Sequence, residues 1–197
     1  MLTADENKLL SEMLENSDEI PNENVRKWLE YGNNMAVFRA NREAGTVFGN
    51  LIKTQLDDAT SEAYQVIKQR LTSYSPPLNL DDYSIYSQVQ LCLKGDCINK
   101  GEYWIPDFML VAERTDIITG EKYLETIIVD SKLSKTTGWT PNQREADKLL
   151  NWTVKSVSGN NLIKGSDLGL TDQSSLIRNG KFIKLFSEEG ILKTGLK

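Results

Sequence analysis

Histidine is absent from this 197-residue sequence. The absence removes the commonest general base, the commonest zinc ligand and every nucleophilic pair built on Ser-His or Cys-His. No apolar run approaches the roughly 20 residues that a membrane-spanning helix needs, and the acidic N-terminus does not resemble a secretory signal. We therefore expect no membrane span and no export signal, and any catalysis must depend on carboxylates, lysine, tyrosine or a metal ion.

Cysteine is scarce too. Cys92 and Cys97 bracket the segment Leu-Lys-Gly-Asp, so they could close a small hairpin loop or remain free thiols. Two cysteines do not define a redox compartment. The composition, 39% hydrophobic and 26% charged, is that of a globular chain long enough to bury a core.

The formal charge of -5 is unevenly distributed. Residues 1–31 hold eight of the 28 acidic and three of the 23 basic residues, which leaves 20 of each sign for the remainder. We therefore expect an acidic N-terminal helical segment over residues 1–33 and a separate domain over 34–197. An acidic chain is a poor general binder of nucleic acid, because phosphate contacts require lysine and arginine.

The first third of the sequence is predicted to be helical. Thr3 and Glu6 form a capping-box pattern before an apolar stripe, and a short helix is expected after Pro21. The spacing of apolar residues predicts a core-facing helix over 34–56 and another over 60–74, which the Ser-Pro-Pro at 75–77 ends.

The pattern then changes to strands. Alternating apolar residues predict one strand over 83–95, and segments 102–113 and 122–132 are predicted to pair as a hairpin. A helix is expected over 140–157, and Asn179-Gly180 between two strand-like runs predicts a second hairpin. The order indicates an α+β fold, three-layer α/β/α-like, with a mixed central sheet and flanking helices.

A charged cluster is expected at one end of the first hairpin. Asp130 and Lys132 are two residues apart on a strand, so both project from the same face. Asp107 lies near the start of the partner strand and can reach Asp130. Two adjacent carboxylates repel each other unless a cation offsets the charge, and Mg²⁺ prefers oxygen ligands of this kind.

Pro106-Asp107 followed by Asp130-Ser131-Lys132 resembles the motif of the PD-(D/E)XK nuclease superfamily. In that superfamily the motif lies on adjacent strands of a mixed sheet flanked by helices. The resemblance covers about residues 35–155. It implies a restriction-endonuclease-like core and a Mg²⁺- or Mn²⁺-dependent endonuclease in which Lys132 assists the attacking water.

The resemblance also implies a set of metal ligands. A preceding helix often supplies a further acidic residue, for which Glu43 is the best match and Glu62 the rival. The implied ligands are Asp107, Asp130, Glu43 and the backbone carbonyl of Ser131.

The segment after Lys132 carries weaker candidates for substrate binding. Many members of the superfamily have a loop and a helix that begins near a threonine or glutamine, and Thr140 and Gln143 match that position. The same two residues also satisfy a capping box, which needs no catalytic role. Lys135 could hold a phosphate or be an ordinary loop residue. Trp139 could stack on a base or cover the core.

By resemblance, the expected setting is the toxin domain of a bacterial contact-dependent or polymorphic toxin system. Such a domain cuts DNA or tRNA in the cytoplasm of a target cell after delivery within a larger exported protein, and a cognate immunity protein neutralises it. Two alternatives stay open. One is a cytoplasmic or phage restriction or repair nuclease, and the other is a non-catalytic acidic binding protein of the immunity type.

Overall fold

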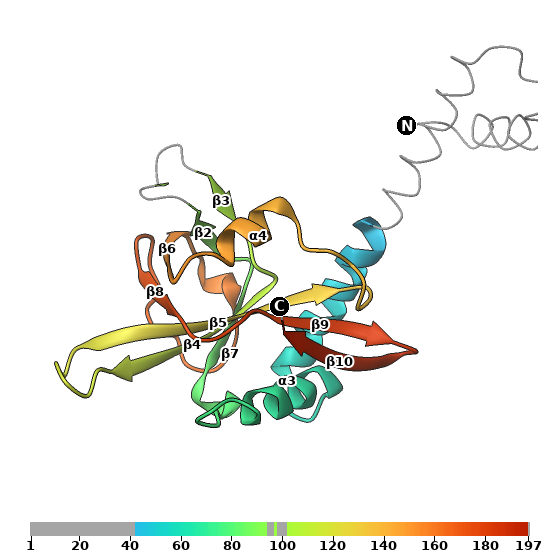
Figure 1. Ribbon diagram of the computed structural model, residues 1–197, viewed down its shortest axis with the longest axis horizontal. Coiled ribbons are helices and arrows are strands. Elements are labelled where there is room, and N and C mark those ends of the chain that lie inside the picture. The colour runs from blue at the N-terminus through green and yellow to red at the C-terminus, as the bar shows by residue number, and fades with distance from the viewer. Residues whose placement is uncertain (1–41, 94–96, 98–101, 197) are drawn as a thin grey trace, which may run out of the picture. The chain divides into compact units, whose positions relative to one another are not determined.

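The computed structural model describes residues 42–93, 97 and 102–196. These residues form an α+β fold in which a curled mixed sheet is accompanied by few helices (Figure 1). The compact unit that contains the sheet is Val47–Lys197, and residues 42–46 belong to the preceding unit. The helices expected within 1–33 lie outside the described residues. No helix in the described part is long and apolar enough to cross a membrane.

The centre of the sheet is the predicted hairpin. Strand β4 (Phe108–Thr115) pairs antiparallel with β5 (Lys122–Lys132), from Phe108 opposite Val129 to Thr115 opposite Lys122. The connecting turn is stabilised by the Asp116 carboxylate, which accepts hydrogen bonds from the backbone of Ile118 and Thr119. The prediction of a hairpin between 102–113 and 122–132 is confirmed.

The segment 83–95 forms two strands rather than the one expected. Gln88 has a positive φ of 59° and separates β1 (Ser84–Ser87) from β2 (Gln90–Cys92). Strand β1 pairs with β4, whereas β2 pairs with β3 (Tyr103–Trp104). One continuous strand over this segment would not produce these two separate pairings. A disulfide joins Cys92 to Cys97 in the β2–β3 connection, which is one of the two alternatives that the sequence allowed.

The helix expected over 140–157 is much shorter. Helix α4 covers only Pro141–Ala146, and Asn151–Ser156 forms strand β6 between β2 and β8 (Ser175–Arg178). Trp152 and Val154 are two residues apart and both buried, which is the spacing of a strand. The prediction was wrong because neighbouring strands on both sides of β6 outweigh the local helical pattern.

Asn179-Gly180 does not form the expected hairpin. Strands β8 and β9 (Ile183–Glu188) lie one after the other along β5 and both pair with it in parallel. The hairpin of this region joins β9 to β10 (Ile191–Leu196) through Glu189 and Gly190, which both have positive φ. The strand order is β3-β2-β6-β8-β5-β4-β1-β7, where β7 is Leu162–Lys164, and β9 and β10 continue from β5.

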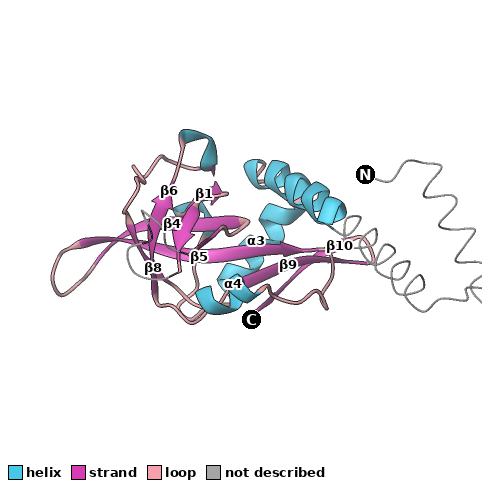
Figure 2. Ribbon diagram, turned by 90° about the horizontal axis from the view of Figure 1, so that it is seen from above, coloured by secondary structure: helices cyan, strands magenta, loops and turns pink. Residues whose placement is uncertain are grey.

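Helices occur on both sides of the sheet (Figure 2). Residues 42–57 are helical, as is α3 (Glu62–Thr72), which agrees with the described parts of the two predicted helices. Among the described residues, short 3-10 helices occur at η2 (Leu80–Asp82) and η3 (Gly159–Asn161). Helix α3 packs on one face of the sheet, in a core that includes Ile52, Leu56, Ile67, Leu71, Leu110, Ile127, Val129, Ile183 and Leu185. We call this the α3-side core.

A second core covers the opposite face and includes α4. Its members include Met109, Ile128, Ala146, Trp152, Leu176 and Phe182, and we call it the α4-side core. Ile127 and Val129 belong to the first core and Ile128 to the second, because successive side chains of β5 point to opposite faces. The alternation continues to the end of the strand and therefore directs Asp130 and Lys132 to the α4 side.

Candidate active site

The central residue of the candidate site is Asp130, near the end of β5. It follows three buried apolar residues, 127–129, and is itself 1% exposed. A buried carboxylate is costly unless charged or hydrogen-bonding groups surround it. The charged and hydrogen-bonding neighbours of Asp130 therefore determine its protonation state and its capacity to bind a ligand.

Lys132 and Gln143 are the close partners of Asp130. The Lys132 Nζ lies 2.5 Å from Asp130 Oδ2, and Gln143 Nε2 donates a 2.6 Å hydrogen bond to Oδ1. Asp130 Oδ2 is therefore buried against the Lys132 ammonium, which places a positive charge next to this oxygen.

Asp107 lies at the start of β4 and reaches the end of β5. Its Oδ2 accepts hydrogen bonds from the backbone N of Ser131 at 2.8 Å and from the Ser131 Oγ at 2.7 Å. The hairpin register creates this contact, because Phe108 is opposite Val129. The structure therefore brings together Asp107, Asp130, Ser131 and Lys132, as the sequence predicted.

The surroundings shift the protonation of Asp130. Burial raises its pKa from the ordinary value of 3.8 to about 7, and the negative charge of Asp107 acts in the same direction. The positive charge of Lys132 opposes the shift. With this pKa, the ionised form of Asp130 is disfavoured near neutral pH, and a bound cation would stabilise it.

Gln143 forms the predicted capping box and also contacts the charged pair on β5. Its Oε1 accepts a 2.9 Å hydrogen bond from the backbone N of Thr140, and Thr140 Oγ1 accepts from the Gln143 backbone, so the capping box is present. The same Oε1 accepts from Lys132 Nζ at 3.2 Å. The start of α4 is thereby connected directly to the charged pair on β5.

Lys184 is a member of the site that the sequence reasoning missed. Position 184 on β9 pairs with Asp130 in the parallel ladder, and the Lys184 Nζ donates to the backbone carbonyls of Lys135 and, at 2.6 Å, Thr137. Burial and the charge of Lys132 lower the pKa of Lys184, while Asp130 raises it. The one signal in the sequence is a lysine between Ile183 and Leu185 in an apolar strand.

The loop between β5 and α4 carries Trp139. The Lys132 Nζ lies 5.4 Å from the centre of the Trp139 ring, within the range of a cation–π contact. The ring also meets Phe182 edge-on, with centroids 5.9 Å apart. Trp139 thus contacts both the charged site and the α4-side core, so covering the core is part of its role.

The candidates for a third carboxylate lie on the two N-terminal helices. Glu43 is exposed and belongs to the unit that precedes Val47, so its part in the site stays a prediction. Glu62 is engaged elsewhere, since its Oε1 accepts a hydrogen bond from the backbone N of Leu192 in β10. No group of three acidic, cysteine or histidine side chains with metal-binding spacing occurs within 42–93, 97 and 102–196.

The helix over 42–57 nevertheless approaches the site at Gly49. A Cβ placed on Gly49 would lie 3.7 Å from Ser131 Oγ, which is an ordinary van der Waals distance. Glycine is therefore not required for this approach. Within the compact unit, the helical residues around Gly49 therefore lie beside Ser131 on β5.

The available donors suit a hard divalent cation. Asp107 and Asp130 supply carboxylate oxygens at the ends of adjacent strands, and burial together with the charge of Asp107 raises the pKa of Asp130, an effect that a bound cation would oppose. Mg²⁺ and Mn²⁺ prefer such oxygens and retain waters when few protein ligands are present. The residues present fit the metal that the motif implies.

Comparison of the chain with protein-family models, curated proteins and solved structures yields no match.

Proposed function

We propose that this protein is a metal-dependent endonuclease of the PD-(D/E)XK type that hydrolyses phosphodiester bonds of DNA or tRNA. The observation that carries the proposal is the pair of carboxylates Asp107, which is half-buried, and Asp130, which is buried; two adjacent antiparallel strands bring them together, with Lys132 on the same face as Asp130. The neighbouring strand β9 is parallel to β5, and the sheet is therefore mixed.

In this proposal the metal would be held by Asp107 and Asp130, with the backbone carbonyl of Ser131, and a part for Glu43 stays a prediction from the sequence. Bound Mg²⁺ or Mn²⁺ supplies charge neutralisation at the phosphate and makes water a better nucleophile at neutral pH. Lys132 positions the attacking water and stabilises the negative charge that develops on the phosphate.

Gln143 positions the lysine. Its amide donates to Asp130 and accepts from Lys132, so it holds the two charged side chains at a fixed spacing. Preorganised charges of this kind lower a barrier because they need little rearrangement during the reaction.

The proposed setting is a toxin domain of a bacterial competition system, with a cognate immunity protein as its inhibitor. Toxicity on expression without a partner, lost in Asp130→Asn, is the expected behaviour in cells.

The deciding experiment is cleavage by the purified chain. Plasmid DNA and total tRNA are incubated with Mg²⁺, with Mn²⁺ or with EDTA, using wild type, Asp130→Asn and the control Glu113→Gln, which alters an exposed ion pair on β4. We expect metal-dependent cleavage by wild type and by the control and none by Asp130→Asn. Absence of cleavage with both metals, or equal activity of Asp130→Asn, would refute the proposal and favour an acidic binding protein.

Metal binding has a readout that does not depend on activity. A cation that binds only the folded state raises the melting temperature in a concentration-dependent manner. We expect Mg²⁺ and Mn²⁺ to raise the melting temperature of wild type and Glu113→Gln but not that of Asp130→Asn.

A further inference from the structure

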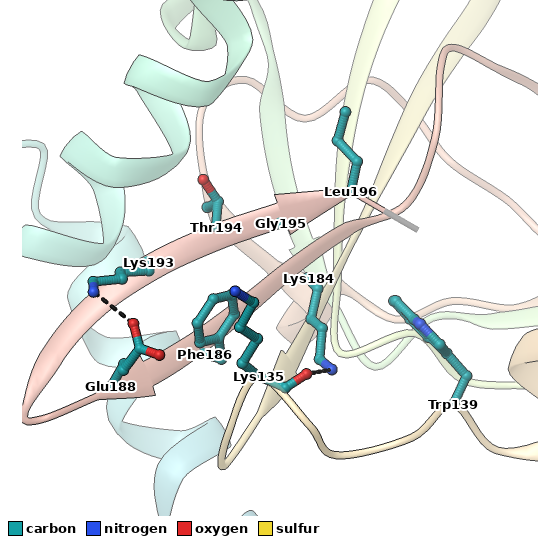
Figure 3. Close-up of a pocket in the computed structure, with 9 residues that line it drawn as sticks. All are labelled: Lys135, Trp139, Lys184, Phe186, Glu188, Lys193, Thr194, Gly195 and Leu196. Atoms are coloured by element: carbon teal, nitrogen blue, oxygen red, sulfur yellow. Dashed lines mark hydrogen bonds and ion pairs between the residues drawn. The ribbon is translucent and has the colours of Figure 1, made fainter.

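A cavity of about 610 Å³ opens beside the candidate active site, between the loop after β5 and the β9–β10 hairpin (Figure 3). Its volume lies in the range of small-molecule and cofactor sites. Lys135 and Trp139 line it from the loop, and Lys184, Phe186 and Lys193 line it from the hairpin.

The cavity shares two residues with the charged site. Lys184 lines the cavity and also pairs in register with Asp130. Trp139 lines it as well, and its ring is 5.4 Å from the Nζ of Lys132. A molecule that reacts at Asp130 and Lys132 would therefore extend naturally into this space.

The lining is basic, in contrast to the chain as a whole. Three lysines and one glutamate line the cavity, which leaves two net positive charges where the entire chain has a net charge of -5. Lys193 forms an ion pair with Glu188 at 2.5 Å, and Lys184 is held by two backbone carbonyls. Lys135 is exposed in the lining and contributes a positive charge near Glu188.

We propose that this cavity binds the phosphodiester backbone of the substrate strand next to the scissile phosphate, with Lys135 as a phosphate contact. The inference rests on the proposed nuclease function and names a subsite for it. Phosphate contacts require lysine or arginine, and the net positive charge of this lining would let a chain with net acidity attract a polyanion locally.

The test separates binding from cleavage. Asp130→Asn is used in EDTA, so that no strand is cut, and fluorescence anisotropy measures its affinity for labelled single strands of about 12 nucleotides, of DNA in one arm and RNA in the other. Lys135→Glu is introduced into this background. The matched control is Lys122→Glu, which reverses the charge of an exposed side chain at the opposite end of β5.

We expect Lys135→Glu to weaken binding at least about tenfold and to lower the salt dependence by roughly one phosphate contact, while Lys122→Glu stays within about twofold. The side chain of Lys135 is exposed, and its carbonyl contact to Lys184 is retained in the variant, so folding is expected to be unaffected. Near-UV circular dichroism checks this.

A second readout uses tryptophan fluorescence. Binding in the cavity is expected to change the emission of Trp139, and the change is expected to disappear in Trp139→Phe. Equal affinities of the Lys135→Glu and Lys122→Glu variants, or no binding of either oligonucleotide, would overturn the subsite. Neither result would depend on the metal-dependent cleavage that tests the nuclease itself.

Discussion

Asp130 and Lys184 occupy paired positions on the parallel strands β5 and β9, and both side chains project to the α4 side of the sheet. Lys184 does not form an ion pair of its own with Asp130 among the described contacts. Its Nζ donates instead to the backbone carbonyls of Lys135 and Thr137. These hydrogen bonds hold the loop that carries Trp139 against β9. The parallel ladder thereby connects the acidic residue to the wall of the basic cavity.

Replacement of Lys184 by methionine keeps the aliphatic stem and removes both hydrogen bonds. At about 1 kcal/mol for each bond, we expect the free energy of unfolding to fall by about 2 kcal/mol. Since the loop is then less ordered, KM for the nucleic acid should rise more than kcat falls. Urea denaturation and steady-state cleavage measure the two effects.

The matched control is Lys164→Met. The Lys164 Nζ, on strand β7 at the far end of the strand order from β5, donates to one backbone carbonyl, that of Asp57, and lies 5.7 Å from the centre of the Tyr64 ring. We expect a smaller loss of stability, about 1 kcal/mol, and an unchanged KM. Equal effects on KM for the two variants would show that Lys184 does not position the loop.

The raised pKa of Asp130 predicts an unusual dependence of stability on pH. Between its unfolded value of 3.8 and its folded value of about 7, the folded state binds more protons than the unfolded state. The free energy of unfolding must therefore fall as the pH rises through this window, by an amount on the order of 4 kcal/mol from this group. Below the window, where the carboxyl is neutral in both states, the contribution is fully present.

Asp130→Asn isolates this contribution because asparagine does not titrate. In EDTA, we expect the variant to gain stability relative to wild type as the pH rises from about 4 to about 7, and the difference to level off above that. Urea denaturation across the range measures it. If the two stability curves ran parallel, burial would not be raising the pKa of Asp130.

The parts of the site that follow from local sequence were predictable. Asp130 and Lys132 share a face because they are two residues apart on a strand, and Asp107 meets them because a short turn returns the chain. Thr140 and Gln143 form the capping box that their spacing indicates. Each of these relationships depends on a few neighbouring residues.

Long-range pairing explains what was missed. Lys184 reaches the site through the parallel pairing of β9 with β5, for which no local pattern exists. Asn179-Gly180 has the glycine that a turn needs, with a φ of 73°, but the turn joins two strands that follow each other along β5. Turn chemistry predicts a change of direction, not the partner of the next strand.

Gln143 offers a test of the connection between α4 and the charged pair. Gln143→Ala removes the donor to Asp130, the acceptor for Lys132 and the side-chain acceptor for the Thr140 backbone N, so we expect a loss of about 2–3 kcal/mol in the free energy of unfolding. Thr140→Ala disrupts only the cap and should cost about 1 kcal/mol. Cleavage should slow in Gln143→Ala under conditions where the protein is fully folded.

The comparison of the two variants separates capping from site geometry. If Gln143→Ala and Thr140→Ala lost the same stability, the contacts of Gln143 with Asp130 and Lys132 would contribute nothing, and its role would be that of a cap alone. Denaturation in urea at one pH is sufficient to decide.

Two glycines with similar backbone geometry test the junction of β8 and β9. Gly180 and Gly190 have φ values of 73° and 79°. A Cβ on Gly180 would lie 2.6 Å from a ring carbon of Tyr74, whereas a Cβ on Gly190 would meet nothing within 4 Å. Alanine at position 190 should therefore cost only the backbone strain of the left-handed region, about 1 kcal/mol, and alanine at position 180 should cost at least twice as much. Equal losses for the two variants in thermal denaturation would mean that Tyr74 can move away and that it does not hold the junction in place.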